Sequence, residues 1–199
     1  MADYTTTSAM KTYLRIASAS DDALIGSLVT RASNLIDDHC GRWFAAQTLT
    51  RKFDAVGGHI TGKLLLLDAD LLTVTSIVNG DGASISGGSY ILRPANWPPY
   101  FGISLKQSSG LRWNYLTDPE EAITISGTWG YSATAPEPIV QAAVRLAAWL
   151  YRQRDTGADP VPQQVETTER GVARPPARLP QDVAELLGPY MRLRISAVA

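Results

Sequence analysis

The sequence predicts an α+β fold in which a helical frame carries an inserted β-rich piece. Amphipathic periodicity predicts helices near residues 20–40 and 136–154, and a shorter one near 180–194. Between the first two, residues from about 48 to 130 are rich in β-branched side chains and divided by glycine and proline. Many short strands of this kind are typical of a small antiparallel β-barrel or sandwich.

The composition is typical of a globular protein with a hydrophobic core. The chain has 199 residues, of which 45% are hydrophobic, so a sizeable core is expected. The net charge of −1 argues against a dedicated nucleic-acid binder. Cys40 is the single cysteine, which excludes an intramolecular disulfide. The longest purely aliphatic run is Leu64–Leu67, far too short to cross a bilayer, so we expect a soluble protein made in the cytoplasm with no membrane partner.

The first helical region contains a short helix at 7–15 and a longer one at 20–40. Ser20 is the expected N-cap of the longer helix, and Gly41 is placed to end it. Its predicted buried stripe is Leu24, Leu28, Ala32, Leu35, Ile36 and His39. The aromatic pair Trp43 and Phe44 follows and is expected to pin the helix end to the core.

Short strand-like segments follow from residue 48. The predicted strands are 48–56, 64–67, 73–78, 89–92, 103–106 and 122–129. Asn79-Gly80-Asp81-Gly82 is a strong turn signal, because these residue types tolerate positive φ. The aromatic loop 97–100 interrupts the strands.

The helix at 136–154 carries a stripe of small and aliphatic residues that would let another helix approach closely. After it, residues 155–179 are rich in proline and mixed charge, which predicts an extended arm. A last helix begins at Pro180 or Gln181 and is broken by Gly188-Pro189. The predicted organisation is a helical core (1–47 and 131–154), a β-rich insertion (48–130), the arm (155–179) and a C-terminal docking helix with tail (180–199).

The sequence contains no recognisable catalytic or metal-binding motif. His39 and Cys40 lack the partners of a four-ligand zinc site, and Asp68 and Asp70 lack the spacing of a calcium loop. No serine lies in a nucleophile elbow. We therefore predict no catalytic, metal-binding or cofactor-binding residues, and no enzyme.

Aromatic residues concentrate in the β-rich insertion and admit two interpretations. A stacking face for sugars or bases is one; packing of the fold or of one subunit on its neighbour is the other. Few basic residues lie nearby, which favours packing or an interface. The residues concerned are Trp97, Tyr100, Phe101, Trp113 and Tyr115.

Several segments together resemble the head–tail connector (adaptor) family of long-tailed double-stranded DNA phages and related prophages. The matching segments are Met10–Arg15, Asp21–Ile25, Ile36–Phe44, Leu67–Ile77, Ser126–Tyr131 and Leu179–Leu187. They cover most of the chain apart from the arm. Shorter members of that family are nearly all helix, so the large β-rich insertion departs from the simplest pattern.

The resemblance implies a non-enzymatic protein of the virion neck, assembled in the bacterial host cytoplasm. It would form a homo-oligomeric ring, commonly a dodecamer, beneath the portal protein. The ring would extend the channel through which double-stranded DNA passes without sequence readout, and would offer a surface to a head-closure (stopper) or tail-completion protein.

Ring closure requires two complementary surfaces on each copy, and two sets of residues are candidates for assembly contacts. The candidate inter-subunit helix face is Ala142, Ala143, Leu146, Ala147 and Leu150. The candidate docking residues for the portal or a neighbouring copy are Val183, Leu186, Leu187, Tyr190 and Met191. The alternative function is a binding module of a virion or prophage particle, whose β-rich insertion recognises a glycan or another structural protein.

Overall fold

The computed structural model describes residues 2–153 and 179–192, and the chain forms two compact units. The helical unit comprises Met1–Gly41 and Pro136–Met191. The sheet unit comprises Arg42–Ala135 and Arg192–Ala199. The predicted arm lies outside the described residues, except for Leu179. Each unit has its own hydrophobic core and is described by itself.

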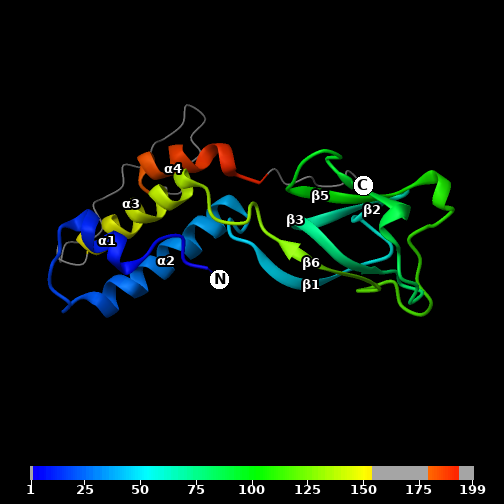
Figure 1. Ribbon diagram of the computed structural model, residues 1–199, viewed down its shortest axis with the longest axis horizontal. Coiled ribbons are helices and arrows are strands. Elements are labelled where there is room, and N and C mark those ends of the chain that lie inside the picture. Colours follow the sequence, from blue (N-terminus) through cyan, green and yellow to red (C-terminus); the bar gives the residue numbers. More distant parts are fainter. Residues whose placement is uncertain (1, 154–178, 193–199) are drawn as a thin grey trace, which may run out of the picture. The chain divides into compact units, whose positions relative to one another are not determined.

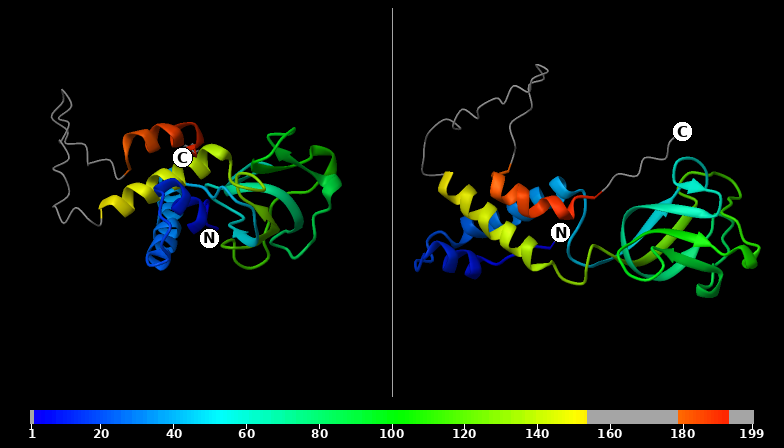
Figure 2. Two further views of the ribbon diagram at one scale, coloured as in Figure 1. Left: turned by 60° about the vertical axis from the view of Figure 1, so that its left-hand side comes forward. Right: turned by 90° about the horizontal axis from the view of Figure 1, so that it is seen from above.

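Helix α3 is the centre of the helical unit. The helices are α1 (Thr7–Leu14), α2 (Asp22–Cys40), α3 (Glu137–Gln153) and α4 (Gln181–Leu187), followed by the 3-10 turn η4 (Gly188–Tyr190). Helix α3 contacts each of the other three, and α4 runs beside it in every view (Figures 1 and 2). Among the described helices, none has the length and apolar character needed to cross a membrane.

The buried stripe of α2 is shifted by one residue from the predicted one. The buried apolar residues are Ile25, Val29, Ala32, Ile36 and Cys40. Leu24 is instead 39% exposed and His39 is also exposed, so these two predictions were wrong. The helix carries two neighbouring apolar stripes, and periodicity alone does not decide which of them faces the core.

Of the two caps predicted for α2, the C-terminal one is confirmed and the N-terminal one is wrong. Gly41 ends the helix with φ 64°, a left-handed conformation that glycine adopts without steric cost, as predicted. The N-cap is Asp21 and not Ser20, and its side chain makes no capping hydrogen bond. The Asp21 carboxylate instead accepts a hydrogen bond from the Tyr151 hydroxyl of α3 at 2.5 Å.

The sheet unit is an antiparallel sheet of six strands, which confirms the α+β class. The strands are β1 (Gln47–Phe53), β2 (Ile60–Thr61), β3 (Leu64–Val78), β4 (Tyr90–Arg93), β5 (Tyr100–Leu105) and β6 (Ile123–Trp129). The order is β1-β6-β3-β5-β4, and β2 pairs with β3. The sheet is not closed into a barrel, because no pairing joins β1 to β4 in this order. The insertion is thus one open sheet where a barrel or sandwich was expected.

Strand β3 organises the sheet because it pairs with two different partners. Its first half pairs with β5, its second half pairs with β6, and the register with β5 shifts between Leu66 and Leu71. Such an irregularity bends a strand and lets it serve both neighbours. The sequence predicted two separate strands, since the polar residues Asp68 and Asp70 interrupt the hydrophobic pattern.

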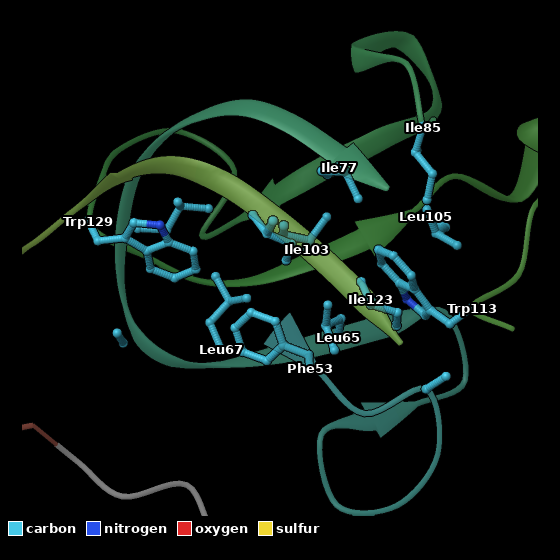
Figure 3. Packing of buried hydrophobic residues seen from close by; sticks show 14 residues of the cluster. Phe53, Leu65, Leu67, Ile77, Ile85, Ile103, Leu105, Trp113, Ile123 and Trp129 are labelled. Carbon is cyan, nitrogen blue, oxygen red and sulfur yellow. The ribbon is translucent and has the colours of Figure 1, made fainter. Parts of the chain in front are cut away.

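Trp129 is the largest fully buried side chain in the core of the sheet unit and lies at one end of the buried cluster (Figure 3). Its indole Nε1 donates a hydrogen bond to the carbonyl of Leu49 at 3.0 Å, so the ring brings no unsatisfied donor into the core. Phe53 stacks on it at a centroid distance of 6.2 Å. The turn predicted at 79–82 is confirmed by the hydrogen bond from Gly82 N–H to the Asn79 carbonyl.

Candidate assembly surfaces

Segment 112–116 presents two exposed apolar side chains on the sheet unit. Tyr115 is 43% exposed and Leu116 is 76% exposed, the largest value among the bulky apolar residues of the described chain. A leucine at this level of exposure contributes little to the stability of its own fold. Grouped exposed apolar side chains often mark interaction sites, so we call Tyr115 and Leu116 the apolar tip.

The apolar tip is held in place by a side-chain network. Asn79 is buried, and its Nδ2 donates to the Arg112 carbonyl at 3.0 Å and to Asn114 Oδ1 at 2.5 Å. Asn114 donates in turn from its main-chain N–H to Asn79 Oδ1 and from Nδ2 to Asp81 Oδ2. Donation from the Ala83 N–H and from the Asn114 side chain lowers the pKa of Asp81, so this acceptor stays ionised at neutral pH.

Two close packing contacts add to this network. Trp113 is buried and donates from Nε1 to the Lys63 carbonyl at 3.0 Å. Gly80 bridges to Tyr115, and a Cβ at this glycine would lie 2.3 Å from the carbonyl oxygen of Asn114. The apolar tip therefore sits on a tightly packed support.

The structure divides the aromatic residues that the sequence grouped together. Trp113 lies in the core and Tyr100 packs against it, as the packing interpretation requires. Trp97 is 69% exposed, and Phe101 and Tyr115 are also exposed. The five residues thus do not form a single stacking face.

Helix α2 carries a second apolar stripe outside the core of the helical unit. Leu24 is exposed, whereas Leu28 and Leu35 are half-buried. Their spacing of four and seven residues places them on one face of the helix, and the exposed Arg31 lies on the same face. We call Leu24, Leu28, Arg31 and Leu35 the outer stripe of α2.

The predicted inter-subunit face of α3 lies largely inside the helical unit. Ala142, Ala143, Leu146 and Ala147 are fully buried, and Leu150 is half-buried. The small alanine side chains allow the other helices of the same chain to approach closely. A direct role of these residues between copies stays a prediction.

The predicted docking residues are divided between the interior and the surface. Val183 and Leu187 are buried where α4 contacts α3, and an ion pair of 3.1 Å joins Arg145 of α3 to Asp182 of α4. Leu186 and Tyr190 are half-buried, and Met191 is 49% exposed. Helix α4 therefore completes the core of its own helical unit, and docking on another protein through its remaining surface stays a prediction.

An arginine–aspartate cluster on the sheet unit was not predicted from the sequence. Arg51 pairs with Asp68 at 2.5 Å and lies 5.6 Å from the centre of the Trp129 ring. Arg42 lies 3.5 Å from the buried Asp70 carboxylate. Arg192 donates from Nη2 to the Leu67 carbonyl at 2.8 Å. Only the two aspartates within an otherwise apolar part of β3 hinted at this cluster, since their partners are far apart in sequence.

Burial and the neighbouring aspartates shift the pKa of Arg192 in opposite directions. Burial lowers the pKa of Arg192, Asp70 raises it and Arg42 lowers it again. The two aspartates offset most of the charge of the three arginines. The ion pairs and hydrogen bonds of the cluster therefore join Arg42, Arg51 and Arg192 to strand β3 and stabilise the sheet unit.

Asp37 is the most perturbed acid of the helical unit. Burial raises its pKa to about 6, and Asp38 adds to this effect. The hydrogen bond that Asp37 Oδ1 accepts from the Tyr4 hydroxyl lowers the pKa in part. Because Tyr4 is buried and its N–H donates to Ser33, the contact fixes the N-terminal segment to α2.

The described residues contain no cluster of side chains that could hold a metal ion. Cys40 is a buried free thiol on α2, whereas the neighbouring His39 points to solvent. No group of three metal-ligating side chains occurs in the parts of the chain that the structure describes. A hollow of about 580 Å³ beside α1 is open and is bordered by Lys11 and Asp22, which pair with each other at 2.6 Å.

The fold matches solved chains from gene transfer agent particles. One is in the neck of an empty particle computed with C6 symmetry, and another is in the neck of a native particle computed with C12 symmetry. Each has a TM-score of 0.60 and 17% identity, with 96% of this chain and 91% of that chain covered. A chain of the native virion matches with a TM-score of 0.56, the same identity and the same coverage.

The comparisons with sequences found nothing. No family model matches the chain, and no curated protein matches it. The likeness to chains of a particle neck is therefore one of fold, and it extends over nearly the whole length of both chains. At this level the resemblance predicted from the sequence is confirmed.

Proposed function

We propose that this chain is a non-enzymatic structural subunit of the neck of a tailed phage or a phage-derived particle. The single observation that carries the proposal is the match to neck chains over 96% of this chain, with both units included. A match restricted to the helices would be weak support, since small helical bundles recur in many proteins. The combined helical and sheet architecture is more specific.

Within the neck, we assign the chain to an adaptor ring beneath the portal protein. C12 symmetry in one matching structure and C6 in another are both compatible with a ring of twelve copies, because sixfold symmetry is contained in twelvefold symmetry. Identical copies close a ring through a heterologous contact between two different surfaces. The portal on one side and a head-closure or tail-completion protein on the other are its expected partners.

Passage of double-stranded DNA fits the charge of the chain. A channel that binds phosphates strongly would hold the DNA, whereas a near-neutral subunit lets it slide. The net charge is −1, and the described arginines on the sheet unit are partly neutralised by Asp68 and Asp70.

The alternative of a glycan-binding module receives less support. Such a site needs several aromatic faces presented together, and Trp113 is buried in the core. Of the five aromatic residues considered, Trp97 is the one that is more than half exposed.

Deletion of the gene, followed by complementation, tests the proposed function. Host cells lacking the chain should produce filled heads that carry the portal but no tail, or heads that have lost their DNA. Complementation should restore tailed particles, in which quantitative mass spectrometry should find as many copies of the chain as of the portal protein. Normal tailed particles without the chain would contradict the proposal.

A further inference from the structure

Asn79 and Gly80 form an Asn-Gly pair, which is the sequence most prone to deamidation, the spontaneous loss of ammonia from an asparagine side chain. In this reaction the main-chain nitrogen of the second residue attacks Cγ of the asparagine. A side chain on the second residue hinders the attack, and glycine has none. The turn at 79–82 is therefore also a place where the chain can be modified without an enzyme.

The fold requires the glycine of this pair. A Cβ at Gly80 would lie 2.3 Å from the carbonyl oxygen of Asn114 and 2.8 Å from Cβ of Ala122. Both distances are much shorter than ordinary van der Waals contacts, so only glycine fits where the turn approaches segment 112–116. Protection of Asn79 from deamidation must therefore come from contacts of Asn79 itself.

The side-chain amide of Asn79 is held by three hydrogen bonds inside the protein. The residue is only 4% exposed. Its Nδ2 donates to the Arg112 carbonyl at 3.0 Å and to Asn114 Oδ1 at 2.5 Å, and its Oδ1 accepts from the Asn114 N–H at 3.3 Å. Deamidation expels Nδ2, so both bonds from this atom have to break. Because buried groups that lose their partners are costly, the network opposes the reaction.

We propose that Asn79 is a latent deamidation site, which Asn114 keeps unreactive as long as segment 112–116 stays in place. Local opening of this segment frees the amide. A base in the solvent then removes the N–H proton of Gly80, and the nitrogen forms a bond to Cγ of Asn79. The Cγ–Nδ2 bond breaks, and the amide nitrogen takes a proton from water and leaves as ammonia.

Water completes the reaction by opening the resulting succinimide ring. Attack at Cγ gives aspartate at position 79, whereas attack at the main-chain carbonyl carbon gives isoaspartate, in which the main chain runs through the side-chain carbons. No oxidant, reductant or enzyme takes part. This inference concerns the chemistry of the sheet unit and does not depend on the proposed function.

Deamidation makes the opening of the segment permanent. The new carboxylate has no N–H to donate, so the Arg112 carbonyl and Asn114 Oδ1 lose their donor and face a negative charge. The Asp81 carboxylate, which accepts from Asn114 Nδ2, adds a second charge to the same network. In isoaspartate the main chain is also one carbon longer, which disturbs the close fit of Gly80. Both products therefore weaken the support of the apolar tip.

Peptide mapping by mass spectrometry of the purified full chain tests the proposed site. The folded chain and the same chain in urea are incubated at mildly alkaline pH, at which the Gly80 N–H is more readily deprotonated. The chain in urea should convert Asn79 to aspartate and isoaspartate, and the folded chain should do so at least about tenfold more slowly. Equal rates in the two states would overturn the proposal, because the fold would then give no protection.

Two variants test whether Asn114 provides this protection. Asn114→Ala removes the acceptor of Asn79 Nδ2 and should raise the deamidation rate of the folded chain by about tenfold, the effect of one lost hydrogen bond on an opening equilibrium. Asp81→Ala leaves Asn79 untouched but removes the acceptor that orients Asn114, and should raise the rate by a smaller factor. Unchanged rates in both variants would contradict the role of Asn114.

Arg192→Ala is the matched control for a general loss of stability. It removes the hydrogen bonds to the carbonyls of Leu67 and Asp68, at another place in the same sheet unit. The deamidation rate of Asn79 should stay close to that of the natural protein, since segment 112–116 keeps its own contacts. A rise equal to that of Asn114→Ala would mean that global unfolding exposes Asn79, and this would refute local protection.

The variant Asn79→Asp tests the consequence of deamidation. Trypsin should cut the bond after Arg112 at least about tenfold faster in this variant than in the natural protein, because the segment is no longer held. Asn96→Asp makes the same change of charge at an exposed position of the same unit and should be cut like the natural protein. Equal cutting of all three proteins would contradict the proposed loss of support.

Discussion

Arg192 donates a hydrogen bond from its guanidinium group to the main-chain carbonyl of Asp68, 124 positions earlier in the chain. A second bond reaches the neighbouring carbonyl of Leu67. Both carbonyls lie where β3 shifts register, so neither residue is aligned with a partner in β5 or β6. Arg192 therefore supplies donors that the sheet does not.

Replacing Arg192 by alanine should destabilise the sheet unit. The substitution leaves two carbonyl groups without their donors, and a lost partner of this kind costs about 1–3 kcal/mol. Urea denaturation followed by tryptophan fluorescence would measure the loss, since Trp129 lies in that core. Arg112→Ala, at an exposed position of the same unit, should change stability by less than about 0.5 kcal/mol. Equal stabilities of the two variants would refute this role of Arg192.

Asp37 should make the helical unit more stable at low pH than at neutral pH. Its pKa in the folded protein is about 6, above the ordinary value of 3.8. The folded state therefore binds more protons than the unfolded state between these values, and this contribution to stability falls as pH rises from about 4 to 6. Above pH 6 the buried carboxylate is charged and the full cost remains.

The variant Asp37→Asn isolates this effect from other titrating groups. It should be more stable than the natural protein above pH 6, by about 1–3 kcal/mol, and the difference should shrink towards pH 4. Thermal unfolding of both proteins across this range would measure the difference. Asp38→Asn, at the exposed neighbouring position, should show a much smaller effect. A difference that does not vary with pH would contradict the assignment.

Leu187→Ala should destabilise the helical unit strongly. Leu187 is fully buried where α4 packs on α3, and truncation of such a leucine costs about 2–5 kcal/mol. Leu116→Ala removes the same atoms from an exposed site and should change the free energy of unfolding by less than about 0.5 kcal/mol. If both variants were equally stable, α4 would not be part of the core.

A C-terminal truncation that removes α4 would affect the folding of the helical unit as well as docking. If residues 180–199 served only for docking, their removal would leave a folded core and abolish only attachment to the portal. In the structure the removal exposes the face of α3 that Val183 and Leu187 cover. Loss of attachment in such a truncation would therefore report instability as well as docking, and substitutions at Met191 are the better probe.

Gly80→Ala should disturb the support of the apolar tip. The new Cβ would lie 2.3 Å from the Asn114 carbonyl, and overpacking of this kind costs about 1–3 kcal/mol. Gly58→Ala is the matched control, because its Cβ would meet no atom within 4 Å. Chemical denaturation should show a loss of stability in the first variant only. Full stability of Gly80→Ala would mean that the segment yields easily.

The sequence predicted those features that depend on local chemistry. Gly41, the turn at 79–82 and the end of α4 before Gly188-Pro189 were predicted because glycine at positive φ and proline without an N–H have residue signatures. Most strand segments were predicted because alternation and β-branched residues mark half-buried strands, whereas the two-residue β2 was missed and β3 was predicted as two strands.

Features set by tertiary contacts could not be predicted in this way. Nothing local shows that Ile25 and not Leu24 faces the core, because both continue an apolar stripe. The continuity of β3 through Asp68 depends on cations supplied by Arg51 and Arg192 from elsewhere in the chain. The network that holds the apolar tip depends on Asn79 and Asn114, which are 35 residues apart.

Electron cryomicroscopy of particles that carry a tagged copy of this chain tests the central claim most directly. The account predicts a closed ring of the tagged chain at the neck, between the portal and the first tail protein, with both the helical and the sheet unit visible in each copy. Density for the tag at the tail tip, on the capsid faces or in one unsymmetrical copy would contradict it.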